Sequence, residues 1–428
     1  MTNLKRHAAP LLLLTLLSAC NRPEPIDEVT LNDASLVENA PHVEAADADW
    51  PWWRGPKQDG KATGSAPVKW SERNNLLWKT PIPGRGHASP AVAGDQIFLA
   101  TADDQAQTQS LVCLSRDTGA HQWTTQIHQG GFMGLHHDNS HASATPACDG
   151  QRVYCAFMVH DGVWLTAVDL QGEIVWQKKV SKFVSRHGYG SSPVLYKSLV
   201  IVVGDNSGGS FLAALHADSG EVAWMVRRQS EASFGTPVVA HVAGKDQLLM
   251  SGHKQIISYN PVTGEKLWTA EGPSESTANT VAWNDDLVFA TGGHPQTALL
   301  AVRADGSGEV AWRSSISGYV PSPLVVGDRL LIVQDRGVAH LLDASSGDIV
   351  WSKRLGGNFY ASPVAAGEHI YVPNRSGMML VFKAGDQYEE VAENFLATGG
   401  EASPVICGGR IYIRTSNHLF CIGRPTAE

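Results

Sequence analysis

Short apolar segments of about four to eight residues, separated by turn-forming pairs of glycine and aspartate, fill the chain from Trp70 onwards. The clearest example runs from Ala91 to Leu99, where Gly94-Asp95 separates two apolar runs. Apolar alternation of this length is typical of β-strands, and a Gly-Asp pair is typical of a tight turn, because glycine adopts a positive φ without steric cost. The pattern predicts an all-β chain built of hairpins.

These hairpins come in pairs that repeat along the chain. Each pair opens with Ser or Thr followed by proline, and its second hairpin has a glycine four residues before a tryptophan. Two hairpins form a four-stranded antiparallel sheet of about 40–50 residues, the usual size of a propeller blade. Such a sheet buries both faces only when neighbouring sheets pack against it, so the repeat predicts a ring of blades. The openings are Ser89-Pro90, Thr145-Pro146, Ser192-Pro193, Thr236-Pro237, Ser322-Pro323, Ser362-Pro363 and Ser403-Pro404, and the glycine–tryptophan pairs are Gly119/Trp123, Gly172/Trp176, Gly220/Trp224, Gly264/Trp268, Gly308/Trp312 and Gly347/Trp351.

Two of the tryptophan segments resemble a known type of repeat. Residues 341–351 and 258–268, each ending in tryptophan, resemble the tryptophan-docking motif of PQQ-like β-propellers, the quinoprotein alcohol dehydrogenase-like family. The Trp-Asp ending of WD40 repeats is absent from these segments. The resemblance covers about residues 70–425 and implies an eight-bladed propeller, a fold that serves both enzymes and pure scaffolds.

Counting the blades tests this interpretation. Six tryptophans define six blades, residues 358–397 form a seventh with its docking position at Val391, and residues 401–422 supply three strands of an eighth. The fourth strand of that blade is expected near the N-terminus, in the segment around Trp78. Pairing the two ends closes the ring and removes two open sheet edges. We therefore expect an all-β, eight-bladed β-propeller over residues 74–425, closed by its N- and C-terminal strands.

The first residues have the pattern of an export signal. A positively charged start precedes an apolar run that is too short to span a bilayer and ends in Leu17-Ser18-Ala19-Cys20. This ending resembles the bacterial lipobox, which implies removal of residues 1–19 as a lipoprotein signal peptide and attachment of lipid such as palmitate to Cys20. The alternative is an ordinary secretory signal with a chance cysteine. Asn21, where aspartate would signal inner-membrane retention, favours the outer membrane, facing the periplasm.

Two further segments precede the repeats. Residues 20–49 carry eight acidic side chains and one basic side chain, which predicts a solvated, flexible tether. Residues 50–73 form an aromatic segment that begins Trp50-Pro51-Trp52-Trp53, and we expect it to latch onto the propeller wall rather than to bind a ligand. The formal net charge of −9 argues against nucleic-acid binding, which needs a concentrated basic surface.

The cysteines bear on cofactor chemistry. The quinoprotein alcohol dehydrogenases that the repeats resemble hold PQQ and Ca²⁺ near the propeller axis, and they typically carry an adjacent Cys-Cys disulfide or a C-x-x-C-H haem site. This chain has neither motif, and its closest cysteines, Cys148 and Cys155, are seven residues apart. We therefore expect no PQQ or haem, and we expect most of the cysteines to be free and buried.

A lipobox, a short linker and eight blades resemble the BamB-type outer-membrane assembly lipoproteins, whose propeller docks partner proteins through loops on one rim. This resemblance implies a non-catalytic binding or scaffold module of the cell envelope, anchored by its lipid and bound to envelope proteins through its rim loops. The alternative is a PQQ-dependent or metal-dependent oxidoreductase with its site at a histidine-rich channel mouth.

Histidines gather in the loops that lead into the innermost strands, which open around one end of the central channel. Exposed loops are commonly polar, but convergent polar groups at a channel mouth are the default prediction for a binding site. A metal held by these imidazoles would be Zn²⁺, Cu²⁺ or a similar ion rather than Ca²⁺ or Mg²⁺. The favoured occupant is a small polar ligand or peptide. The predicted metal ligands are His87, His136, His137, His141 and His187, and the predicted ligand pocket adds Arg85, Arg186 and Tyr189.

Overall fold

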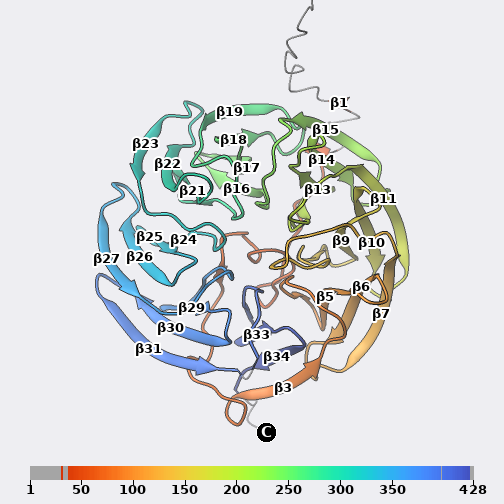
Figure 1. The fold of residues 1–428 in the computed structure, drawn as a ribbon, viewed down its shortest axis with the longest axis horizontal. Coiled ribbons are helices and arrows are strands. Elements are labelled where there is room, and N and C mark those ends of the chain that lie inside the picture. Colours follow the sequence, from red (N-terminus) through yellow and green to blue (C-terminus); the bar gives the residue numbers. More distant parts are fainter. Residues whose placement is uncertain (1–29, 32–36, 397, 425–428) are drawn as a thin grey trace, which may run out of the picture.

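The computed structural model describes residues 30–31, 37–396 and 398–424, which form eight β-sheets arranged radially around a central channel (Figure 1). Each sheet is one blade of four antiparallel strands, and two blades carry an additional two-residue strand at an edge. The predicted all-β, eight-bladed propeller is therefore confirmed. In the described part of the chain, no helix is long and apolar enough to cross a membrane.

In blades 1 to 4 the strands follow chain order from the channel outwards. Blade 1 contains β4 (Ala91–Ala93), β5 (Gln96–Asp103), β6 (Thr108–Ser115) and β7 (His121–Gln129), and blade 2 contains β8 (Ala147–Cys148), β9 (Arg152–Val159), β10 (Gly162–Asp169) and β11 (Ile174–Lys182). Blade 3 contains β12 (Val194–Tyr196), β13 (Leu199–Gly204), β14 (Ser210–His216) and β15 (Val222–Arg228), with β1 (Thr30–Leu31) outside it, and blade 4 contains β16 (Val238–Val242), β17 (Lys245–Gly252), β18 (Gln255–Tyr259) and β19 (Lys266–Glu271).

Blades 5 to 7 follow the same order, and blade 8 is assembled from both ends of the chain. Blade 5 contains β20 (Ala282–Trp283), β21 (Leu287–Gly292), β22 (Ala298–Arg303) and β23 (Val310–Ser314), and blade 6 contains β24 (Leu324–Val326), β25 (Arg329–Val333), β26 (Val338–Asp343) and β27 (Ile349–Arg354). Blade 7 contains β28 (Val364–Ala366), β29 (His369–Pro373), β30 (Met378–Ala384) and β31 (Tyr388–Phe395), with β2 (Lys61–Ala62) beside β28, and blade 8 contains β32 (Val405–Cys407), β33 (Arg410–Arg414), β34 (His418–Ile422) and β3 (Leu76–Pro81).

The ring closes as the sequence predicts. The N-terminal strand β3 pairs antiparallel with the C-terminal strand β34, with Trp78 opposite Cys421, and the two lie side by side in Figure 1. Blade 8 thereby obtains its fourth strand from the other end of the chain, which closes the ring. The cysteines of the described chain are free and buried, as expected; they are Cys113, Cys148, Cys155, Cys407 and Cys421.

Tryptophans join neighbouring blades, and five of those in the described residues pack on a glycine of the next blade. A Cβ atom on Gly119 of blade 1 would lie 2.5 Å from the indole of Trp78 in blade 8, so only glycine fits there. The Trp78 indole N–H also donates to the carbonyl of Arg116 at 3.3 Å. The glycine and the tryptophan that lie four residues apart in one blade therefore contact different blades. The glycine packs on the tryptophan of the preceding blade, and the tryptophan packs on the glycine of the following blade. The same stacking joins Trp123 to Gly172, Trp176 to Gly220, Trp224 to Gly264 and Trp312 to Gly347.

Blade 7 departs from this pattern. The sequence predicts its docking position at Val391, but the structure places Ala392 there, opposite Val381. The prediction is wrong by one residue, because every blade has a β-bulge immediately before its docking position and Val391 is the bulged residue.

Trp70 from the aromatic segment supplies the indole that blade 7 lacks. It stacks on Tyr371 with ring centroids 6.4 Å apart and planes 19° apart, and its backbone N–H donates to the Asn394 side chain at 2.8 Å. Tyr371 has the ladder position of Phe98 in blade 1, which contacts the docking residue Trp123 at 6.0 Å. A ring contributed from outside the blade therefore covers this position.

The Ser or Thr before proline in each opening forms hydrogen bonds around the channel. The backbone N–H of Ser89 donates to the Thr145 hydroxyl at 3.1 Å, and that of Thr145 donates to the Ser192 hydroxyl at 2.9 Å. The Ser89 hydroxyl donates to the carbonyl of Ser403, which joins blade 1 to blade 8. A residue without a hydroxyl would leave a buried N–H unpaired, which explains the repeat. Further bonds of this kind join Ser192 to Thr236, Thr280 to Ser322, Ser322 to Ser362 and Ser362 to Ser403.

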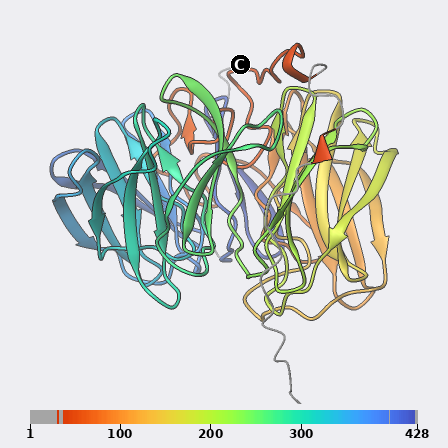
Figure 2. The same cartoon turned by 90° about the horizontal axis from the view of Figure 1, so that it is seen from above.

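Residues 50–62 cross the end of the channel opposite the histidine-bearing loops. Trp50 exchanges two backbone hydrogen bonds with Val92 of blade 1, and the Trp53 indole donates to the Thr280 hydroxyl of blade 5 at 2.9 Å. Strand β2 pairs in parallel with β28 of blade 7. These residues, orange-red in Figure 2, lie along one face of the ring, and Trp53 lines the narrow part of the channel.

Part of the predicted tether contacts the propeller. Val37 is buried, the Lys197 ammonium donates to the carbonyl of Glu38 at 2.6 Å, and Asp49 pairs with Arg116 at 2.9 Å. The predicted signal peptide, Cys20 and most of residues 20–36 lie outside the described residues.

Candidate functional site at the channel mouth

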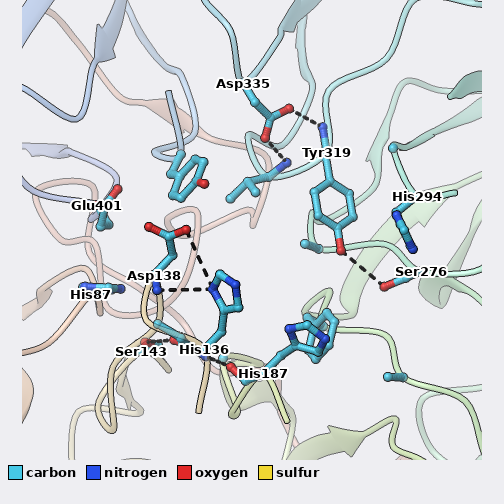
Figure 3. A pocket seen from close by; sticks show the side chains of 18 of the residues that line it. His87, His136, Asp138, Ser143, His187, Ser276, His294, Tyr319, Asp335 and Glu401 are labelled. Atoms are coloured by element: carbon cyan, nitrogen blue, oxygen red, sulfur yellow. Dashed lines mark hydrogen bonds and ion pairs between the residues drawn. The ribbon is translucent and has the colours of Figure 1, made fainter. Parts of the chain in front are cut away.

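The open mouth of the channel is a cavity of about 1000 Å³ (Figure 3). Below it, a narrower space of about 110 Å³ reaches the ring of hydroxyls and Trp53. Eight of the wall residues occupy equivalent positions in the eight blades. Each lies two residues before the Ser or Thr that its blade contributes to the ring of hydroxyls. Each blade contributes one of them: His87, Ser143, Gly190, Phe234, Ala278, Val320, Tyr360 and Glu401.

Only some of the predicted histidines face the cavity. His87, His136 and His187 line it, and the rings of His136 and His187 are 5.6 Å apart. His137 is mostly exposed beside His136, with ring centroids 4.2 Å apart. His141 is turned away, because its two ring nitrogens contact Asp104 at 2.8 Å and the Met133 carbonyl at 3.0 Å.

The three predicted pocket residues that are not histidines do not line this cavity. Tyr189 is buried and donates its hydroxyl to the carbonyl of Val203 at 3.1 Å. Arg85 is exposed and holds the loop of the histidines by donating to the carbonyl of His137 at 3.2 Å. Arg186 is exposed on the loop that carries His187.

A charged group that sequence reasoning missed links three blades across the mouth. Arg375 of blade 7 bonds Asp138 of blade 2 and Glu401 of blade 8, both at 2.8 Å, and lies 4.2 Å over the ring of Tyr360. Burial alone would raise the pKa of Asp138, but the hydrogen bond and charge of Arg375 outweigh it and hold that pKa below its ordinary range. Burial raises the pKa of Glu401, against the effect of Arg375.

The opposite wall comes from blades 4 to 6. Asp335 accepts the backbone N–H groups of Tyr319 at 2.8 Å and of Val320 at 3.0 Å, which fixes both residues in the wall. The Tyr319 hydroxyl lies 3.5 Å from that of Ser276 (Figure 3). Asp335, Arg336 and His294 also line the cavity on this side, and the facing wall carries His136, His187 and Asp138.

His87 stays neutral in the folded protein. Burial, and then the charges of Arg85, Arg414 and Arg375, lower the pKa of its imidazole from about 6.5 to about 3. The side chain is therefore a neutral hydrogen-bonding group in the cavity wall at physiological pH.

Acidification is expected to destabilise the protein through His87. The unfolded chain binds this proton near pH 6.5 and the folded protein only near pH 3, so stability is complete above pH 6.5 and falls below it. At about pH 5 the free energy of unfolding is lower by about 2 kcal/mol, because below pH 6.5 each pH unit lowers it by about 1.4 kcal/mol. Urea unfolding of the wild type and of His87→Gln at neutral pH and at about pH 5 measures the difference. An equal loss in both proteins would contradict this role of His87.

Comparison with known proteins identifies the family. The sequence profile described as "Outer membrane protein assembly factor BamB" matches residues 63–129, 107–327 and 296–417. The chain belongs to this family. BamB of Shewanella oneidensis is 21% identical over 322 residues, which cover 73% of this chain and 64% of that protein. BamB of Yersinia pestis is 23% identical over 362 residues, which cover 79% of this chain and 86% of that protein. The match thus spans less than two thirds of the Shewanella relative.

Solved structures of two kinds share the fold. BamB from Moraxella catarrhalis matches with a TM-score of 0.60 at 14% identity, covering 82% of this chain and 98% of that one. Quinohemoprotein alcohol dehydrogenase from Comamonas testosteroni matches with a TM-score of 0.64 at 11% identity, covering 93% and 83%. These likenesses show the fold alone, which serves a BamB protein and a dehydrogenase equally.

The cavity of this BamB-family chain does not fit the Ca²⁺ that would accompany PQQ. Calcium takes six to eight oxygen ligands. The cavity lining offers three carboxylates, Asp138, Asp335 and Glu401, and both oxygens of Asp335 already accept backbone N–H groups. In the described residues the cluster of potential metal ligands is His136, His137 and Asp138, which is a nitrogen-rich set.

Proposed function

We propose that this protein is a non-catalytic, lipid-anchored scaffold of the cell envelope that binds proteins of outer-membrane assembly. The match of the propeller to the BamB family carries the proposal, and relatives from three bacteria bear the name outer membrane protein assembly factor. The lipobox that ends at Cys20 supports anchoring in the outer membrane on its periplasmic side. In this proposal residues 1–19 are removed, and the segment before the propeller sets its distance from the membrane.

The rim of the mouth is the proposed docking surface for partner proteins. The loop before β12 carries His187, which lies in the cavity wall, and Val184, an apolar residue that is 50% exposed. The Asn206 side chain accepts the backbone N–H of Val184 at 3.1 Å, so the loop presents this residue in a defined place. An exposed aliphatic group beside polar groups is a suitable contact for a partner protein.

Co-purification tests the proposal. The full-length protein, extracted from membranes in mild detergent, is expected to bring down outer-membrane assembly proteins, identified by mass spectrometry. Val184→Glu is expected to reduce their yield, because it places a charge in the docking surface. Ile349→Glu is the matched control, since Ile349 is 56% exposed on the outermost strand of blade 6. Absence of such partners from the wild-type preparation would contradict the proposed function.

A second arm addresses the enzymatic alternative. We expect no quinone absorbance after PQQ and Ca²⁺ are added to the purified protein and removed by desalting, and no dye-linked oxidation of alcohols or sugars. Retention of about one equivalent of quinone would instead favour a PQQ-dependent oxidoreductase, because a specific site retains its cofactor through desalting.

A further inference from the structure

Three consecutive residues at the mouth, His136, His137 and Asp138, bring their ligand atoms within 4.8 Å of one another. His137 Nε2 lies 3.4 Å from Asp138 Oδ2, and His136 Nδ1 lies 3.7 Å from the same oxygen. Two ligands bonded at about 2.0–2.2 Å to a tetrahedral ion are separated by about 3.4 Å. The observed separations therefore match those around a bound ion with little rearrangement.

Neighbouring contacts orient this cluster. Arg375 holds Asp138 Oδ1 at 2.8 Å and leaves Oδ2 directed toward the two imidazoles. Hydrogen bonds to ligating carboxylates are a regular feature of metal sites, because they fix the ligand's orientation. The backbone N–H of Asp138 lies 3.3 Å from His136 Nδ1, a long contact that a metal bond to this nitrogen would replace.

The loop that carries the cluster is held at both ends. Asn139 donates its backbone N–H to the carbonyl of His136 at 2.8 Å and its side-chain amide to the carbonyl of His187 at 2.7 Å. Arg85 holds the His137 carbonyl. The His187 ring lies 5.6 Å from that of His136, near enough for a side-chain rotation to add a fourth ligand.

We infer that His136, His137 and Asp138 form a binding site for a late divalent transition metal, of the class of Zn²⁺ and Cu²⁺, at the mouth of the channel. Two imidazoles and one carboxylate are a ligand set suited to these ions and too poor in oxygen for Ca²⁺ or Mg²⁺. The exposed fraction of the side chains, 43% for His136 and 82% for His137, lets an ion enter from solvent. This site is independent of the proposed scaffold function.

Zinc binding to the full-length protein, purified in detergent without a histidine tag, tests the inference. Competition with a chromophoric zinc chelator is expected to give one equivalent of bound Zn²⁺ that millimolar Ca²⁺ or Mg²⁺ does not displace. His136→Ala and His137→Ala should each weaken binding by at least about tenfold, because changes even to groups around the ligands commonly cost that much. Asp138→Asn should also weaken it, and His187→Ala reports whether a fourth protein ligand takes part.

The matched control is His141→Ala. His141 lies on the same loop, but Asp104 and the Met133 carbonyl occupy its ring nitrogens, so its loss should leave zinc affinity unchanged within about twofold. Thermal unfolding of each variant shows whether the propeller is intact. No bound zinc in the wild type, or equal affinity in the wild type and the His136→Ala/His137→Ala double variant, would overturn the inference. Neither result would bear on co-purification with envelope proteins.

Discussion

Replacing Trp70 by alanine is expected to lower the free energy of unfolding by about 3–5 kcal/mol, the usual cost of truncating a buried aromatic side chain to alanine. Trp70 is 5% exposed and packs in the cluster that joins blades 7 and 8. Blade 7 has Ala392 at its docking position, so it has no indole of its own to fill the space over Tyr371. Removing Trp70 would leave a cavity next to the strand that closes the ring.

Urea unfolding of the full-length protein measures this loss, and Trp70→Phe is the control. The Trp70 indole N–H finds no acceptor among the described residues, so phenylalanine retains the stacking on Tyr371 without losing a hydrogen bond. We expect Trp70→Phe to recover most of the stability. A loss below about 1 kcal/mol in Trp70→Ala would show that the contact with blade 7 contributes little.

Replacing Asp205 by asparagine is expected to destabilise the protein by about 3–5 kcal/mol, because the change leaves the buried charge of Arg228 without its partner. Arg228 donates to both oxygens of Asp205, at 2.8 and 3.0 Å, and both side chains are 2% exposed. It also donates to the Tyr259 hydroxyl of blade 4 at 2.6 Å. Burial alone would raise the pKa of Asp205, but Arg228 and His253 outweigh it, and the pKa is lowered.

A double-mutant cycle separates the pair from its surroundings. Asp205→Leu combined with Arg228→Met should cost less than the sum of the two single changes, because neither charge is then left buried alone. Asp205 also pairs through its backbone with Ser233, the residue before Phe234 in the cavity wall, so the single variants should disturb the mouth as well. Additive losses in the cycle would contradict a direct coupling between the two charges.

The propeller itself was predictable because its signals are local and repeated. Alternating apolar residues define strands, Gly-Asp pairs define turns, and a repeated tryptophan defines blades, so even the pairing of Trp78 with the C-terminal strand followed from counting. The prediction of the docking position in blade 7 failed because a β-bulge shifts the register by one residue. Without a tryptophan at the docking position, the sequence does not show where the bulge lies.

The location of the site was predictable from the sequence, but the set of residues that line it was not. Aligning the openings would have found Glu401 and Tyr360, which share the position of His87, because the innermost strands of all blades present that residue to the channel. No local signal marks Arg375, which reaches Asp138 across 237 residues. Likewise, His141 is a residue type that binds metals, but its side chain bonds Asp104 and points away from the cavity.

The amino-acid sequence alone is sufficient for the strand pattern, the number of blades, the closure of the ring and the end of the channel where polar loops gather. The partners of Trp70, the charge pairs of Asp205 and Arg375, and the choice of histidines that face the cavity depend on folding. The first group follows from backbone periodicity within about ten residues, which each repeat carries in full. The second group depends on side-chain direction and on contacts between distant segments, which are set only when the blades close around one channel.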